Sequence, residues 1–91
     1  MIRHQLKNLN VDTPVELTIE DNINSVCTLV VENINDSGNI FIGNNSVSSN
    51  DFGFKLYPRQ AFTVELRPYD RLYAVADSDI QISCMSIERS V

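Results

Sequence analysis

The chain has 91 residues, of which 43% are hydrophobic, and its seven Lys and Arg against twelve Asp and Glu give a formal net charge of −5. This length allows one domain with a small core, which self-association would naturally supplement. The scattered cations do not supply the basic face that nucleic-acid binding needs, and no apolar run is long enough to cross a membrane. We therefore expect no nucleic-acid partner and no membrane partner.

The first residues of the chain follow a different pattern from the rest. Ile2, Leu6 and Leu9 have a loosely helical spacing, but a single uncapped turn is marginal in water. Polar residues then break any helix. We predict an N-terminal arm at residues 1–12 that becomes ordered only against a neighbour, with a frayed terminus as the alternative, and a folded domain at residues 13–91.

Strand patterns begin at Pro14, where apolar and polar residues alternate as they do in a half-buried strand. Residues 25–33 are β-branched and almost continuously apolar, which predicts a central strand covered on both faces. A turn cluster at residues 35–38 follows, so we expect this strand to form a hairpin with residues 39–42.

The second half of the chain contains further strand patterns at residues 61–66 and 71–76, separated by turn signals. In the last strand the apolar phase changes, because Met85 and Ile87 lie on the face opposite to that of Cys84. This slip indicates either a bulge near Cys84 or a strand end that a neighbouring subunit covers. The whole pattern predicts an all-β fold, a small antiparallel β-sandwich of about seven strands that is Ig-like or jelly-roll-like.

The sequence offers few residues for catalysis. His4 is the only histidine, and we interpret it as a surface residue without an orienting partner. Glycine-rich phosphate loops are missing from the sequence, and the turn carboxylates Asp77 and Asp79 lack the full spacing of a calcium loop. Cys27 and Cys84 lie in apolar runs of a chain whose start does not resemble a secretory signal, so we expect buried, reduced thiols. We predict a protein that is not an enzyme, with no cofactor and no bound metal.

Residues 38–76 carry glycines, aromatics and a proline in a distinctive order. An aromatic-Ile-Gly strand end, a polar loop, a Gly-Phe-x-Leu-x-Pro corner and a Leu-Tyr-Ala strand resemble a small β-sandwich family of tailed-phage virion proteins. The chain departs from that pattern at Lys55, where the family has proline, and at residues 59–60, where it has Gly-Glu. Because Arg59 disfavours a positive φ, we expect a type I turn here. The matching residues are Phe41, Ile42, Gly43, Gly53, Phe54, Leu56, Pro58, Leu72, Tyr73 and Ala74.

The resemblance implies a viral structural protein: a capsid cement or decoration protein of the virion, assembled in the host cytoplasm, that stabilises the phage head by bridging capsomers. Its partners would be the major capsid protein or another virion protein, together with further copies of itself in a homotrimer. The alternative is a tail, neck or fibre-associated module that recognises another virion protein or, through Tyr57, Tyr69 or Tyr73, a glycan. The residues predicted to bind partners are Ile2, Arg3, Leu6, Lys7, Leu9, Met85 and Ile87.

Overall fold

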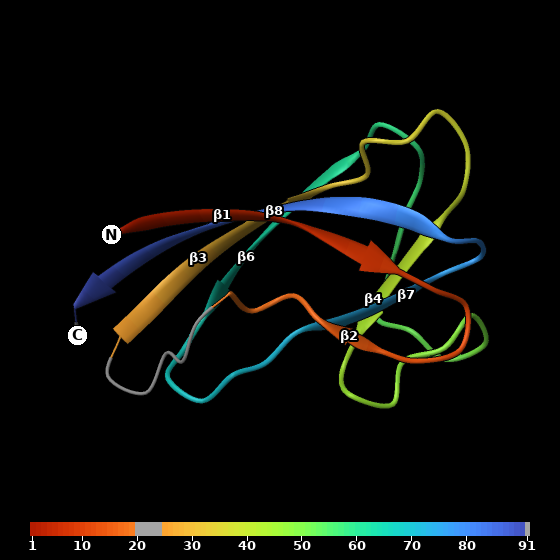
Figure 1. Ribbon diagram of the computed structural model, residues 1–91. Helices are drawn as coiled ribbons and strands as arrows, with labels where there is room; N and C mark the ends of the chain where they lie inside the picture. The colour runs from red at the N-terminus through yellow and green to blue at the C-terminus, as the bar shows by residue number, and fades with distance from the viewer. Residues whose placement is uncertain (20–24, 91) are drawn as a thin grey trace.

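The protein is built from two antiparallel four-stranded sheets packed face to face (Figure 1). The computed structural model describes residues 1–19 and 25–90, and no helix that could span a membrane occurs among them. The strands are β1 (Ile2–Leu9), β2 (Val15–Glu16), β3 (Ser25–Glu32), β4 (Ile40–Gly43), β5 (Phe54–Leu56), β6 (Ala61–Leu66), β7 (Tyr73–Ala76) and β8 (Ile80–Ser90). We call β1-β8-β3-β6 the long sheet and β2-β7-β4-β5 the short sheet.

The strands pair from the two ends of the chain inward, the first with the last and the second with the last but one. β1 pairs with β8, β2 with β7, β3 with β6 and β4 with β5, so the chain folds back on itself around the β4–β5 loop. Eight strands paired in this order form a jelly roll, a double-sheet architecture made of two Greek keys. The predicted antiparallel sandwich is confirmed, and its connectivity is that of a jelly roll and not of an immunoglobulin domain.

The core lies between the two sheets and is made by alternate residues of each strand. In β3, the odd-numbered residues from Ser25 to Val31 are buried, whereas the even-numbered residues point to the outer face and are partly exposed. Burial of one face is what period-two alternation produces in a sandwich. The buried hydrophobic cluster comprises Leu9, Leu17, Cys27, Leu29, Val31, Ile40, Ile42, Leu56, Leu66, Ala74, Ala76, Ile82 and Cys84.

Two predicted arrangements near the start of the chain are wrong. The segment expected to be a separate arm contains β1, which pairs with β8 along its whole length and places Leu9 in the core. The hairpin expected between residues 25–33 and 39–42 is not formed, because β3 and β4 lie in different sheets. Both predictions were based on local residue spacing and were wrong because jelly-roll pairing joins strands that are distant in the sequence.

The last strand contains no bulge. β8 keeps a continuous register with β1 on one side and β3 on the other, so the prediction of a bulge at Cys84 is wrong. The apolar phase changes because the inner position after Cys84 is a buried serine, Ser86, while Met85 and Ile87 point to the outer face.

The two outer faces of the sandwich differ in how they are covered. Val47, the single apolar residue among residues 44–51 of the β4–β5 loop, folds back onto Phe41 and Val75 on the outer face of the short sheet and is only 4% exposed. Phe52 of the same loop lies against Phe41, with ring centroids 5.0 Å apart. The short sheet is thus covered by the chain's own loop, which gives the lone valine in the polar stretch a structural role.

Two turns adopt a backbone conformation that their sequence disfavours. Arg59 has a φ of 66° and Tyr69 a φ of 72°, each at the third position of a turn whose second residue is proline. A positive φ at this position defines a type II turn, so the expected type I turn at Arg59 is wrong. The Arg59 amide donates a 2.8 Å hydrogen bond to the Asn33 carbonyl, and its guanidinium pairs with Asp36, interactions that offset the local strain.

Candidate protein-interaction surface

The outer face of the long sheet carries a group of apolar residues drawn from three adjacent strands. Ile2 of β1 lies directly opposite Ile87 of β8, and Met85 of β8 lies opposite Val30 of β3. Outer positions in neighbouring strands stand side by side, because residues facing one another across a ladder point to the same face. We call this surface the outer apolar face. It consists of Ile2, Leu6, Val26, Val30, Met85 and Ile87.

Several of these side chains are unusually exposed for their size. Ile2 is 65% exposed, Leu6 56% and Met85 38%, whereas the inner positions Leu9 of β1 and Ile82 and Cys84 of β8 are buried. Among the residues that the structure describes, none folds over this face as Val47 folds over the short sheet. Large exposed apolar areas bounded by polar residues are typical of interaction sites.

Charged residues lie at the margin of the outer apolar face and not in its centre. Glu32 pairs with Ser83 beyond one end of the patch, and Arg89 pairs with Val26 at the other end. Glu65 of the edge strand β6 bounds it on one side. An apolar centre with a charged rim is the composition found in protein–protein interfaces.

Four of the seven residues predicted to bind partners are gathered on this face, and three are not. Ile2, Leu6, Met85 and Ile87 lie together, although they come from opposite ends of the chain. Arg3, Lys7 and Leu9 occupy the alternate positions of β1 and point to the inner side, where Leu9 is only 3% exposed and part of the core.

Val26 and Val30 belong to the outer apolar face but were not predicted as partner-binding residues. The signal for them was present in the sequence, since the almost continuous apolar run of β3 predicted a strand covered on both faces. Only the inner face of β3 is buried by the residues described. The described residues of one chain therefore cover β3 on its inner face and not on its outer face, where the prediction also expected cover.

Neither cysteine is placed for nucleophilic chemistry. Cys84 is fully buried, and desolvation raises the pKa of its thiol from 9.0 to about 11, an effect that the nearby positive charge of Lys7 partly offsets. The Cys27 sulfur lies 2.8 Å from the Ser86 hydroxyl oxygen. Cys84 pairs in register with Val31, four residues from Cys27 along β3, so the two cysteines are about 13 Å apart along the strand and too far to form a disulfide. Both thiols are free, as predicted.

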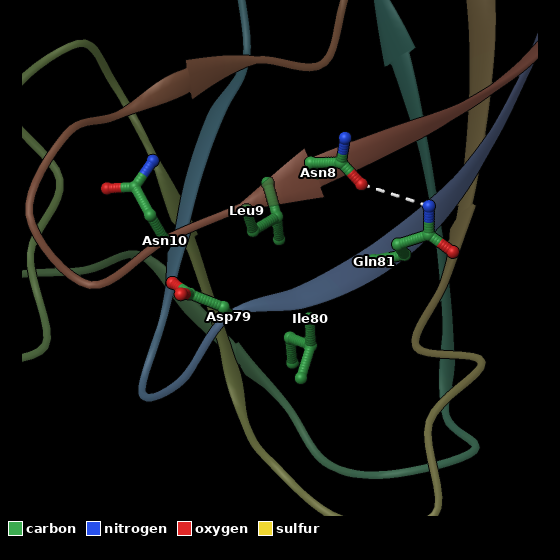
Figure 2. A pocket seen from close by; sticks show the side chains of 6 residues that line it. All are labelled: Asn8, Leu9, Asn10, Asp79, Ile80 and Gln81. Atoms are coloured by element: carbon green, nitrogen blue, oxygen red, sulfur yellow. Dashed lines mark hydrogen bonds between the residues drawn. The ribbon is translucent and has the colours of Figure 1, made fainter.

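A shallow depression of about 400 Å³ lies where β1 ends beside the start of β8 (Figure 2). Its amide side chains already serve the fold: Gln81 donates a 2.9 Å hydrogen bond to Asn8, and the Asn10 side-chain oxygen accepts from the main-chain amides of Asp12 and Thr13. The Asp79 carboxylate is exposed at one side. These contacts make the depression a turn-stabilising corner of the fold.

The tyrosines considered for glycan binding are not in ring contact with one another. Tyr57 and Tyr69 lie in the turns at opposite ends of β6, and Tyr73 packs with Phe41 and Val75 on the short sheet. The Lys55 ammonium stands 4.9 Å from the centre of the Tyr57 ring. The three tyrosines therefore do not form one shared aromatic platform.

His4 pairs with Met85 on the outer face. Within residues 1–19 and 25–90, no three His, Cys, Asp or Glu side chains come close enough together to hold a metal ion. Comparison with known proteins finds no matching family profile, curated protein or solved structure.

Proposed function

We propose that this protein is a viral structural protein, a capsid cement or decoration protein that stabilises the phage head by bridging capsomers. The observation that supports this proposal most directly is the outer apolar face, a surface of exposed apolar side chains suited to binding another protein. A protein that acts by binding needs such a surface and no nucleophile, which agrees with the buried, protonated thiol of Cys84.

The fold adds a second, weaker line of support. Eight-stranded jelly rolls recur in viral capsid and lectin domains, so the strand order is compatible both with a capsid role and with the alternative of a carbohydrate-binding tail module. Tyr57 and Tyr69 lie at opposite ends of β6 and do not build one shared aromatic platform, which favours the capsid role. The sequence resemblance at residues 41–43, 53–58 and 72–74 supports the same choice.

In this proposal the protein acts as a homotrimer on the virion surface after assembly in the host cytoplasm, and its partner is the major capsid protein or another virion protein. The outer apolar face joins the copies. Many trimers attached to one shell make the total attachment strong even when each contact is modest, because every bound copy raises the effective concentration of the next contact. Added buried area across capsomer boundaries then resists opening of the shell.

Copy number in purified virions tests this proposal. Quantitative mass spectrometry with isotope-labelled peptides should detect the chain at a number of copies comparable to that of the major capsid protein. A few copies per particle would instead indicate a tail, neck or fibre component. Absence from the particle would overturn the virion assignment altogether.

A further inference from the structure

The free edge of β1 has features of its own, apart from the outer apolar face. β1 is an eight-residue strand at the margin of the long sheet, and only β8 pairs with it among the described residues. Long exposed edges present unpaired main-chain groups and are ready templates for another strand. Proteins use such edges to capture extended segments of their partners.

Hydrogen bonds at the start of β1 define which of its main-chain groups face outward. Met1 and Glu88 form a closely bonded pair, with nitrogen–oxygen distances of 3.1 Å and 2.8 Å in the two directions. Bonded and non-bonded pairs alternate along an antiparallel ladder, so the next bonded pairs are those of Arg3, Gln5 and Lys7. The amide and carbonyl groups that point away from β8, toward the free edge, therefore belong to Ile2, His4, Leu6 and Asn8.

The two faces of β1 carry different chemistry. The residues whose main-chain groups face the free edge have side chains on the outer face, including the exposed Ile2 and Leu6. Arg3 and Lys7 lie on the other face. The Lys7 ammonium donates a 2.6 Å hydrogen bond to the main-chain carbonyl of Glu16, which leaves its positive charge uncancelled by that contact.

Charge is distributed unevenly between this strand and the rest of the chain. Residues 1–11 contain two of the seven Lys and Arg and no Asp or Glu, whereas residues 12–91 contain all twelve acidic residues. β1 thus carries cations and no acidic residue in an otherwise acidic chain. A strand added here would place alternate side chains beside the apolar residues and the others beside the cations.

We propose that the free edge of β1 binds, in antiparallel orientation, an extended segment of a protein partner in which apolar and acidic residues alternate. The apolar side chains of that segment widen the outer apolar face beside Ile2 and Leu6, and its carboxylates lie near Arg3 and Lys7. The main chain of the segment bonds to the four outward-facing residues of β1. This inference does not depend on the proposed capsid role.

A second copy of the chain fits this edge less well than an acidic segment when the two strands pair around Gln5. Two β1 strands paired antiparallel around Gln5 place Arg3 of one copy opposite Lys7 of the other, and like charges directly opposite one another destabilise a sheet. Inward-pointing lysines on edge strands also discourage association between identical sheets. The charge pattern therefore favours an acidic partner and acts against self-pairing in this register.

A synthetic nine-residue peptide of alternating valine and glutamate, titrated into the full chain and followed by amide NMR, tests the proposal. We expect the amides of Ile2, His4, Leu6 and Asn8 to gain protection from hydrogen exchange, while those of Arg3 and Gln5 are protected already. The matched peptide with lysine in place of glutamate should bind far more weakly. Protection of a different strand, or equal binding of the two peptides, would overturn the proposal.

Backbone methylation of the peptide provides a control that leaves the protein unchanged. In antiparallel addition the valine amides point at β1 and the glutamate amides point away, so N-methylation at the valines should abolish binding and N-methylation at the glutamates should preserve it. Equal effects at both sets of positions would rule out strand addition.

Variants of the protein test the two faces of the edge separately. Leu6→Pro removes an outward-facing amide without removing a hydrogen bond to β8, so it should block binding, whereas Leu6→Ala should only weaken it. Reversing both charges in an Arg3→Glu, Lys7→Glu variant should weaken binding roughly three- to tenfold, since exposed ion pairs are individually modest. A folded Leu6→Pro variant that binds normally would contradict the proposal, and if this variant does not fold, the methylated peptides decide.

Discussion

The side-chain amide of Asn33 donates a 3.2 Å hydrogen bond to the main-chain carbonyl of Leu56 and so connects the end of β3 in the long sheet with β5 in the short sheet. The same amide donates to the Gly38 carbonyl at 2.9 Å, and the side-chain oxygen accepts from the Asn35 side chain at 2.8 Å. Asn33 has no exposed surface, so this polar group is stable only because its hydrogen bonds are made inside the protein.

Asn33→Ala should lower the free energy of unfolding by about 2–4 kcal/mol, because it leaves buried carbonyl groups without donors. Urea unfolding followed by circular dichroism measures this change. Asn45→Ala in the exposed β4–β5 loop is the matched control and should change stability by less than about 0.5 kcal/mol. Equal stability of the two variants would show that the Asn33 contacts do not hold the sheets together.

β1 should contribute to stability as a strand of the sandwich and not as a detachable arm. Leu9 is 3% exposed and Leu6 56% exposed, although both lie in the same strand. Leu9→Ala should therefore cost about 2–4 kcal/mol of unfolding free energy, through lost burial and a residual cavity, and Leu6→Ala less than about 1 kcal/mol. Thermal unfolding of the two variants makes the comparison. Similar small losses in both would favour the arm that the sequence suggested.

The sequence was most informative where a strand obeys a simple period. β3 was predicted within one residue of its observed end, because its β-branched residues and the following turn cluster leave little choice. Its pairing was not predictable in the same way. A turn cluster after a strand usually closes a hairpin, but the buried amide of Asn33 and its contact with Leu56 direct the chain across to the other sheet.

The candidate interaction surface was only partly predictable from the sequence. Apolar residues at both ends of the chain suggested partner contacts, but their meeting on one face depends on the β1–β8 register, which couples Ile2 to Ile87. The alternation within β1, which directs Lys7 inward, was obscured by the loosely helical spacing of its apolar residues. The prediction of the turn type at Arg59 was wrong for a tertiary reason. The Asn33 carbonyl accepts a hydrogen bond from the Arg59 amide and so stabilises a conformation that arginine otherwise disfavours.

Stability should fall in alkaline solution because of Cys84. Its pKa is raised in the folded state, so the folded protein holds a proton that the unfolded chain loses as the pH rises above the ordinary value of 9.0. The stabilising contribution is complete below pH 9 and is lost as pH increases toward about 11, a change of about 2–3 kcal/mol. Urea unfolding at several pH values measures how the free energy of unfolding changes with pH.

Other groups also titrate in this range, so Cys84→Ala is the required comparison. In the variant, the free energy of unfolding should fall less steeply with pH in this range, because the thiol is missing. The variant should also be less stable at neutral pH, because a buried group is removed. Identical slopes in the two proteins between pH 9 and 11 would contradict the raised pKa.

Glycine in place of Tyr69, in the turn between β6 and β7, should stabilise the folded protein. Tyr69 is 69% exposed and has a φ of 72°, a region that costs a residue with a side chain about 1–2 kcal/mol. Part of the gain from Tyr69→Gly is offset by the greater freedom of glycine in the unfolded chain. We expect a net stabilisation of about 0.5–1 kcal/mol, measured by urea unfolding. Tyr69→Ala keeps the backbone penalty and serves as the control, and a variant with glycine that is no more stable than the one with alanine would contradict strain at this turn.

The outer apolar face should control self-association. Met85 is 38% exposed between His4 and Val30 in the middle of the long sheet, and a carboxylate at this position would be desolvated on contact with another copy. We expect the protein to be a trimer at tens of micromolar and Met85→Asp to be a folded monomer, as measured by size exclusion with light scattering. The matched control is Tyr57→Asp, because Tyr57 is 50% exposed and follows β5, a strand of the short sheet. It should remain trimeric. A monomeric parent protein would contradict a preassembled oligomer, whereas dissociation by Tyr57→Asp and not by Met85→Asp would move the interface to the opposite side of the sandwich.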